Sequence, residues 1–122
     1  MTGVKGMEAV KQDQWEVVCT RSDLVVNSGV CALVNGEQVA IYYLPDTERK
    51  VYALGNRDPI GKANVMSRGI VGDLGGKLVV ASPLYKQHYA LETGACLEEE
   101  GVFIPCYDVQ LDGDEVHVRA AG

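Results

Sequence analysis

The sequence predicts an all-β sandwich or barrel. Short runs of β-branched, aromatic and other apolar residues recur along the chain, and turns that contain glycine separate them. The pairs Asn35-Gly36 and Asp112-Gly113 have the composition of tight hairpin turns, in which the backbone needs positive φ angles. Helical periodicity is nearly absent. We therefore expect about eight short strands and hardly any helix.

The first half of the chain supplies four of the expected strands. Residues 15–19 alternate like a strand, with Trp15 expected in the core, and residues 20–24 suggest a single helical turn. Two further strands meet at the Asn35-Gly36 turn. The second of them has no polar face, so we expect it to be buried on both sides. The strands of this half span residues 15–19, 29–34, 38–44 and 50–54.

The second half begins with a long segment of low periodicity. Residues 55–76 contain six glycines among twenty-two residues, and we expect them to be irregular. An irregular stretch of that length in a small domain is usually functional. Pro105 interrupts an apolar run and so indicates an edge strand or a bulge. The remaining expected strands span residues 77–81, 88–91, 102–109 and 115–119.

Length and charge restrict the class of protein. At 122 residues the chain is long enough for one domain, which we place at residues 14–122, after a flexible polar tail at residues 1–13. Its net charge of −6 would repel a nucleic-acid backbone. It has no apolar run of the roughly 18 residues that a membrane span needs, and residues 1–13 contain no apolar signal segment. We therefore expect a cytoplasmic protein that binds neither nucleic acid nor membrane.

Cysteine and histidine are too few and too scattered for a zinc site. None of the four cysteines forms a Cys-x-x-Cys pair, and the chain has two histidines. In the cytoplasm the cysteines should be reduced thiols. His88 could act as a general base, but a single histidine in a strand is more often a hydrogen-bonded or surface residue, and the same holds for His117.

Two stretches of the second half have the frame of a metal site without its ligands. They are Asn56-Arg57-Asp58-Pro59, and Ser82-Pro83-Leu84-Tyr85 followed by a short strand and Thr93-Gly94-Ala95-Cys96-Leu97. Together they resemble the two cluster-binding loops of a Rieske iron–sulfur domain. In that resemblance Asn56 and Ser82 take the places of the two cysteines, and Asp58 and Tyr85 take those of the two histidines. It implies a Rieske-like antiparallel β-sandwich in which residues 56–97 form a smaller, loop-rich lobe in place of the cluster-binding subdomain.

The residues at these four positions do not suit a Rieske cluster. Such a cluster needs two thiolates on one iron and two imidazoles on the other, whereas the chain offers an amide, a carboxyl, a hydroxyl and a phenol. We therefore expect this chain to bind no metal and no cofactor, although a [2Fe–2S] cluster is the cofactor usually credited to the family. Two other interpretations stay open. One is an oxygen-ligand site for a hard cation, built on Asp58 with Asn56 and Ser82; the other is that these side chains hydrogen-bond the two loops to each other.

The combination of Asp58-Pro59, Ser67-Arg68-Gly69 and Ser82-Pro83-Leu84 narrows the resemblance. From Trp15 onward the chain is similar to the small subunit of assimilatory NAD(P)H-dependent nitrite reductase. That family implies a large partner subunit with FAD, a [4Fe–4S] cluster and sirohaem, which passes six electrons to nitrite and forms ammonium in nitrate assimilation. The resemblance implies a small subunit without catalytic residues, serving assembly, stability or the geometry of the electron path. Two alternatives are a Rieske-type ferredoxin that carries electrons, and a freestanding β-domain that binds a small ligand in the vacated site.

Basic residues gather around both loops of an otherwise acidic chain. They are either solvated side chains or a surface for a partner, and charge complementarity would orient and accelerate docking of the large subunit. Tyr85 would be the aromatic anchor of that surface. The candidate docking residues are Arg57, Pro59, Lys62, Arg68, Leu84, Tyr85 and Lys86.

Overall fold

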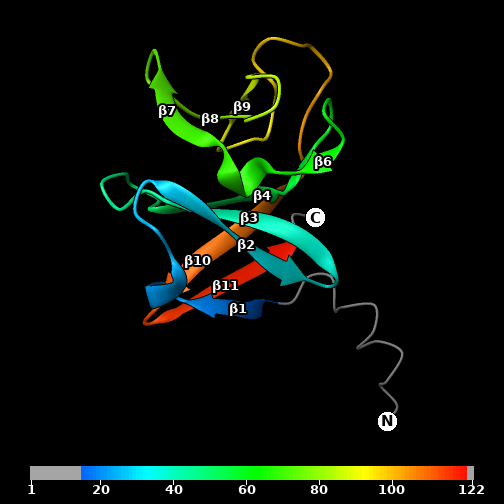
Figure 1. The fold of residues 1–122 in the computed structure, drawn as a ribbon. Helices are drawn as coiled ribbons and strands as arrows, with labels where there is room; N and C mark the ends of the chain where they lie inside the picture. The colour runs from blue at the N-terminus through cyan, green and yellow to red at the C-terminus, as the bar shows by residue number, and fades with distance from the viewer. Residues whose placement is uncertain (1–14, 121–122) are drawn as a thin grey trace.

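The main sheet has six antiparallel strands. The structure is a computed structural model that describes residues 15–120, so the tail expected at residues 1–13 lies outside the described residues. Neighbouring strands follow the order β1-β11-β10-β4-β3-β2 (Figure 1). Their bounds are Glu16–Thr20 for β1, Ser28–Val34 for β2, Glu37–Tyr43 for β3, Val51–Gly55 for β4, Cys106–Asp112 for β10 and Glu115–Ala120 for β11.

Two small sheets lie together at one end of the molecule, above the main sheet in the view of Figure 1. One is the antiparallel pair β5 and β6, and the other has the order β7-β8-β9. All five strands come from the part of the chain between β4 and β10, so one excursion from the main sheet builds this end. Their bounds are Arg57–Asp58 for β5, Ala63–Asn64 for β6, Ile70–Leu74 for β7, Lys77–Ala81 for β8 and His88–Ala90 for β9.

Helix is limited, within residues 15–120, to two short 3₁₀ turns, η2 at Arg21–Asp23 and η3 at Met66–Arg68. The first is closed at its start by Asp23, whose Oδ2 accepts hydrogen bonds from the backbone N of Thr20 at 3.0 Å and from its Oγ1 at 3.1 Å. The all-β prediction is therefore confirmed, and so is the single helical turn expected over residues 20–24.

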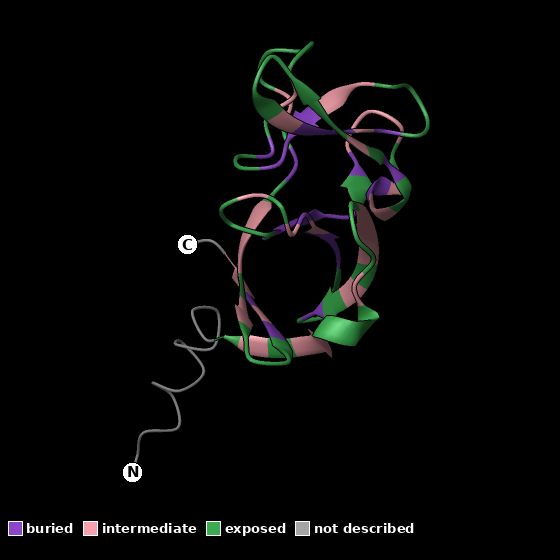
Figure 2. Ribbon diagram, turned by 90° about the vertical axis from the view of Figure 1, so that its left-hand side faces the viewer, coloured by how far each residue is buried: buried purple, intermediate pink, exposed green. Residues whose placement is uncertain are grey.

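Strand β3 is buried on both faces, as its sequence predicts. Ala40 and Tyr42 belong to a core cluster that also takes side chains from the small sheets, such as Tyr89. Val39 and Ile41 belong to a second cluster, which is formed by strands of the main sheet alone. Figure 2 explains the second cluster, because the main sheet curves until its edge strands β1 and β2 come close to each other.

Both predicted hairpin turns are present. Asn35 and Gly36 have φ angles of 51° and 81° and connect β2 to β3. Gly113, with a φ of 63°, lies in the turn between β10 and β11. Positive φ at these positions is the reason for the asparagine and the glycines in the sequence.

Three expectations about single segments are wrong. The stretch 55–76 is not irregular throughout, since β7 runs through it and pairs with β8 across a Gly75-Gly76 turn. Strand β10 begins after Pro105, and the residues before it make only an isolated bridge between Ala95 and Phe103. Trp15 is 37% exposed rather than buried. The guanidinium of Arg119 lies 4.5 Å from its ring centroid and covers one face of it.

Candidate functional site at the two loops

Asn56 is buried and fixes the first loop, residues 56–64, to the main sheet. Its side-chain Nδ2 donates to Oε1 of Gln38 on β3 at 2.9 Å, and its Oδ1 accepts from the backbone N of Ser67 at 2.7 Å. The Asn56 amide therefore hydrogen-bonds to β3 and η3. It makes no bond to the second loop, residues 82–87, within the described residues. An amide suits this place because it donates and accepts at once.

Asp58 closes the first loop on itself. Its carboxylate is fully buried, and Oδ1 accepts hydrogen bonds from the backbone N of Ile60 at 2.8 Å and of Gly61 at 3.0 Å. Burial alone would raise the pKa of this carboxyl, but the hydrogen bonds from Ser82, Gly61 and Ile60 outweigh it, and the pKa lies below its ordinary value. Asp58 is therefore a buried carboxylate, ionised at neutral pH.

Ser82 joins the second loop to the first. Its Oγ donates a hydrogen bond to Oδ2 of Asp58 and accepts one from the backbone N of Leu84 at 3.2 Å. The loop that follows is closed by backbone bonds from Ser82 N to Gln87 O at 2.9 Å and from Lys86 N to Ser82 O at 3.1 Å. Of the interpretations left open by the sequence, this geometry matches the hydrogen bond between the loops.

The two loops also touch through apolar atoms. A Cβ added to Gly61 would lie 2.5 Å from Cδ1 of Leu84 and 3.2 Å from Asp58 Oδ2, so a larger residue at this position would push the Leu84 side chain aside. Tyr85, at the fourth ligand position of the Rieske frame, stands apart from this contact and is 61% exposed. The structure thus brings Asp58 and Ser82 together and leaves Asn56 and Tyr85 outside their contact.

These donors do not fit a Rieske cluster. The four positions supply no thiolate and no imidazole, and the two that meet are already bound to each other. A hard cation fits no better, because the Asp58 oxygens face N–H and O–H donors whose positive ends would repel it. Within residues 15–120, no group of three or more histidine, cysteine, aspartate or glutamate side chains is arranged to hold a metal ion.

The basic residues around the loops are all exposed, and they come from different elements. Arg57 is on β5, Lys62 is in the turn before β6, Arg68 ends η3 and Lys86 precedes β9. Lys62 and Lys86 have φ angles of 60° and 68°, an uncommon conformation for residues other than glycine. Both turns thus hold a lysine where glycine or asparagine would be less strained.

Both histidines are paired with acidic side chains at the surface. Nδ1 of His88 lies 2.6 Å from Oε2 of Glu98, and the backbone N of His88 donates to the other oxygen of the same carboxylate at 2.8 Å. Nε2 of His117 lies 3.1 Å from Oε1 of Glu115. These contacts agree with the hydrogen-bonded interpretation of both histidines. All four cysteines carry free thiols.

Sequence reasoning missed two residues of the site. Gln38 carries the hydrogen bond from Asn56, but it is eighteen positions away in sequence and gives no signal of its own. Tyr89 is fully buried on β9, and within the described residues its hydroxyl has no hydrogen-bond partner. Burial and the negative charge of Asp58 both raise the pKa of Tyr89, so the phenol stays protonated.

The curved antiparallel sheet and the two loops set on it define a Rieske-like domain. The family model of the Rieske-like [2Fe–2S] domain matches residues 14–119. The nitrite reductase (NADH) small subunit of Salmonella typhimurium is 42% identical over 106 residues, which cover 87% of this chain and 97% of that relative. The solution structure of the nitrite reductase [NAD(P)H] small subunit of Erwinia carotovora is 42% identical with a TM-score of 0.72, covering 88% of this chain and 82% of that one.

The chain belongs to the family of nitrite reductase small subunits. A further match is with the nitrite reductase [NAD(P)H] large subunit of Klebsiella oxytoca, which is 35% identical over 116 residues. This match covers 95% of the present chain but only 10% of the much longer relative. A domain similar to this chain therefore also occurs as one part of a large-subunit polypeptide.

Proposed function

We propose that this chain is the small subunit of an NAD(P)H-dependent nitrite reductase and that it associates with the large subunit of that enzyme. The observation that carries the proposal is the 42% identity to the Salmonella typhimurium small subunit over 97% of that relative. The Klebsiella oxytoca match supports association with a large subunit, because in that relative a similar domain is part of the large-subunit polypeptide.

In this proposal the large subunit carries FAD, a [4Fe–4S] cluster and sirohaem, and it reduces nitrite to ammonium with electrons from NAD(P)H in the cytoplasm. The present chain makes and breaks no bonds of the substrate. It serves assembly, stability or the geometry of the electron path. Within residues 15–120, no helix has the length and apolar character needed to cross a membrane.

We also propose that this chain works without an iron–sulfur cluster. Support comes from the buried contact between Ser82 and Asp58, which occupies the place where two ligands would have to face a metal. The test is to express the chain with ample iron and sulfide, alongside a Rieske ferredoxin purified in the same way. We expect the ferredoxin to contain stoichiometric iron and visible absorption, and this chain to contain neither. Iron bound in stoichiometric amount to this chain would overturn the proposal.

The large subunit is proposed to dock on a tip surface around the two loops. This tip surface comprises Arg57, Pro59, Lys62, Arg68, Leu84, Tyr85 and Lys86. Tyr85 and Leu84 are exposed apolar side chains beside the exposed cations of a chain with net charge −6. Tyrosine and arginine are the side chains that most often carry the energy of an interface.

Calorimetric titration of the large subunit tests the tip surface. Tyr85→Ala should weaken association by about 1–3 kcal/mol if Tyr85 is an anchor, and Lys86→Ala should weaken it less. Lys50→Ala is a matched control, because Lys50 is likewise an exposed lysine with a positive φ of 70°, but lies between β3 and β4. Tip variants that bind like the wild type, while the control loses affinity, would show that the loops are only structural.

The two alternatives give different results in the same preparation. A Rieske-type ferredoxin would be coloured, would contain iron and would pass electrons to an oxygenase. A freestanding ligand-binding domain would be colourless and would bind no large subunit. A colourless, iron-free chain that the large subunit retains agrees with the proposed function alone.

A further inference from the structure

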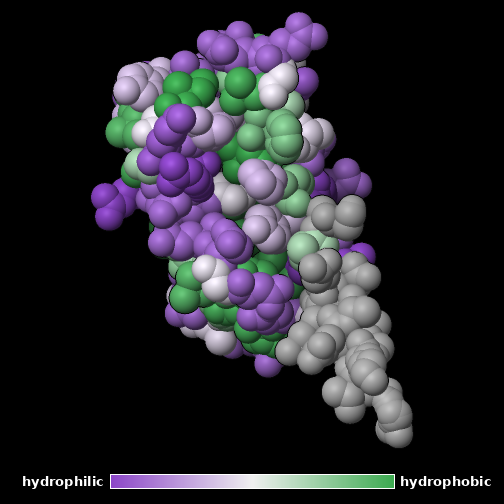
Figure 3. Space-filling model, turned by 90° about the vertical axis from the view of Figure 1, so that its right-hand side faces the viewer, coloured by the Kyte–Doolittle hydropathy of each residue, from purple (hydrophilic) through white to green (hydrophobic). Residues whose placement is uncertain are grey.

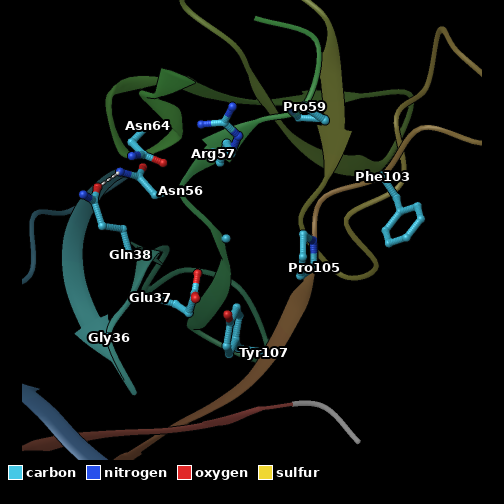
Figure 4. Close-up of a pocket in the computed structure, with 11 residues that line it drawn as sticks. Gly36, Glu37, Gln38, Asn56, Arg57, Pro59, Asn64, Phe103, Pro105 and Tyr107 are labelled. Carbon is cyan, nitrogen blue, oxygen red and sulfur yellow. Dashed lines mark hydrogen bonds between the residues drawn. The ribbon is translucent and has the colours of Figure 1, made fainter. Parts of the chain in front are cut away.

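A hollow of about 420 Å³ lies beside Arg57, in the range of natural ligand and peptide pockets. We call it the Arg57 pocket. It opens where the start of β3, the end of β4, β5 and the segment 103–107 meet (Figure 4). Of the four positions of the Rieske frame, Asn56 lines this hollow, whereas Asp58, Ser82 and Tyr85 do not, so the hollow is separate from the contact between Asp58 and Ser82.

The floor of the pocket is held in place before any partner binds. The backbone N of Gly55 donates to Pro105 O at 2.8 Å, and the backbone N of Asn56 donates to Gln38 O at 3.0 Å. The side chains of Asn56 and Gln38 add a bond of 2.9 Å, which Figure 4 shows as a dashed line. A pocket whose floor joins three segments in this way costs little ordering energy when it is filled.

One wall of the pocket is apolar and the other is polar. Figure 4 shows Phe103 and Pro105 on one side, and Arg57, Asn64 and Gln38 on the other. Phe103 is the only phenylalanine of the chain and is 63% exposed. An exposed aromatic ring beside an arginine has the composition of an interface centre.

The pocket carries opposite charges at its two ends. Figure 4 places Arg57 at one end and Glu37, beside Tyr107, at the other. Within residues 15–120, neither side chain takes part in an ion pair. Both charges are therefore available to a partner, and they fix the direction in which an extended chain would lie.

The pocket is continuous with the tip surface. Pro59 lines the pocket and belongs to the tip surface, and the turn that it starts touches Leu84 through Gly61. Figure 3 shows hydrophobic side chains among hydrophilic ones on the upper part of the molecule, and further hydrophobic side chains on its lower part. A partner that covers the tip surface would also reach the pocket.

We propose that the Arg57 pocket receives an extended segment of the large subunit. In this segment a carboxylate pairs with Arg57, and an apolar side chain packs on Phe103 and Pro105. The inference rests on the proposed function, because it assigns a site to the same partner. It adds that residues outside the tip surface, above all Phe103, anchor the complex.

The test measures binding of the purified large subunit to four variants of the full chain. Phe103→Ala and Arg57→Glu should each weaken the affinity about ten- to a hundred-fold. Val26→Ala is the control for Phe103, since Val26 is an apolar side chain with 58% exposure that lies before the start of β2, away from the Asn35-Gly36 turn. Lys77→Glu is the control for Arg57, since Lys77 is an exposed cation on β8 and the change in charge is the same. We expect both controls to bind like the wild type.

Hydrogen exchange on the wild-type complex tests the same site without substitutions. We expect the large subunit to slow exchange at residues 36–38, 55–57 and 103–107. Wild-type association with unchanged exchange there and full affinity of both pocket variants would overturn the inference and leave the proposed function intact. No association of the wild type at all would overturn the proposed function itself. If Phe103→Ala instead breaks up a self-associated form of the isolated chain, the occupant is a second copy and the inference is wrong.

Discussion

At the scale of single residues, the site depends on the buried carboxylate of Asp58 and on the Ser82 hydroxyl that donates a hydrogen bond to it. Asp58 has no cation beside it within the described residues, so its charge is stabilised by three hydrogen-bond donors. Two of these are backbone N–H groups of the same turn, and the third is the Ser82 hydroxyl from the other loop. Removing the hydroxyl would leave one carboxylate oxygen buried without its partner.

Ser82→Ala should therefore lower the free energy of unfolding by about 1–3 kcal/mol, the usual effect of an unsatisfied buried group. Ser67→Ala is the control, because the Ser67 hydroxyl makes no hydrogen bond within residues 15–120. Urea denaturation of both variants measures the difference. A Ser82→Ala midpoint equal to that of the control would mean that water replaces the hydroxyl without loss.

The same pair predicts how stability responds to acid. The pKa of Asp58 is lower in the folded chain than the 3.8 of an unperturbed aspartate, so its contribution is complete above that value and is lost as the pH falls through the folded pKa. Without the Ser82 hydroxyl the folded pKa of Asp58 rises, so Ser82→Ala has less of this contribution to lose. We expect the difference in unfolding free energy between the wild type and Ser82→Ala, measured by urea denaturation at a series of pH values, to shrink as the pH falls through the folded pKa of Asp58. A difference that stays constant into acid would show that Asp58 is already neutral in the folded state.

At the scale of elements, the sequence predicts structure that depends on residues close together in the chain. It does not predict contacts between residues that are far apart in the chain. The β2–β3 hairpin follows from Asn35-Gly36, and the buried β3 follows from its own apolar run. Strand β7 was missed although its Gly75-Gly76 turn is a two-residue hairpin signal, because so many glycines hid the alternation. The Asp58–Ser82 bond joins residues twenty-four positions apart, and the sequence pointed to it only through the resemblance to the two loops of a Rieske domain.

Gly94, in the second stretch of the Rieske frame, fixes the geometry between two elements. It ends the turn after β9 with a φ of +82°, and an added Cβ would overlap the backbone carbonyl of Ile104. Its backbone N also donates to Ala90 O at 2.7 Å, and its O accepts from Ile104 N at 2.8 Å, so the turn is bonded both to β9 and to the segment before β10. Glycine is required here by conformation and by space together.

Gly94→Ala should thus cost more than conformational strain alone. We expect a loss of about 2–4 kcal/mol of unfolding free energy, from the left-handed backbone and the overlap combined. Gly75→Ala is the matched control, because Gly75 has a φ of +61° and nothing within 4 Å of an added Cβ. It should lose only about 1–2 kcal/mol. Equal losses in thermal or urea unfolding would mean that the 102–104 segment gives way and does not hold the turn.

At the scale of the whole molecule, the two ends of the domain lie together at one edge of the main sheet, and Ala120, at the end of β11, is opposite Tyr107 of the Arg57 pocket. Strands β1 and β11 pair at one edge of the main sheet, with Glu16 opposite Val118, so the first and last described strands leave the molecule together. The small sheets and loops are at the far end in Figure 1. A tether on either end would therefore start near the Arg57 pocket and away from the small sheets, in keeping with the Klebsiella oxytoca polypeptide, in which a similar domain is joined to the large subunit.

Fusing this chain to its large subunit should preserve docking whichever end carries the linker. A glycine–serine linker of about 20 residues spans about 25 Å on average and supplies an effective concentration of about a millimolar. That concentration should mask the weaker binding of Phe103→Ala, so the fused variant stays docked where the separate subunits come apart on dilution. Hydrogen exchange at residues 55–57 and 103–107 in nanomolar samples measures docking directly. If neither fusion shows protection although the separate wild-type subunits bind, the β1–β11 edge itself belongs to the interface and the orientation argued here is reversed.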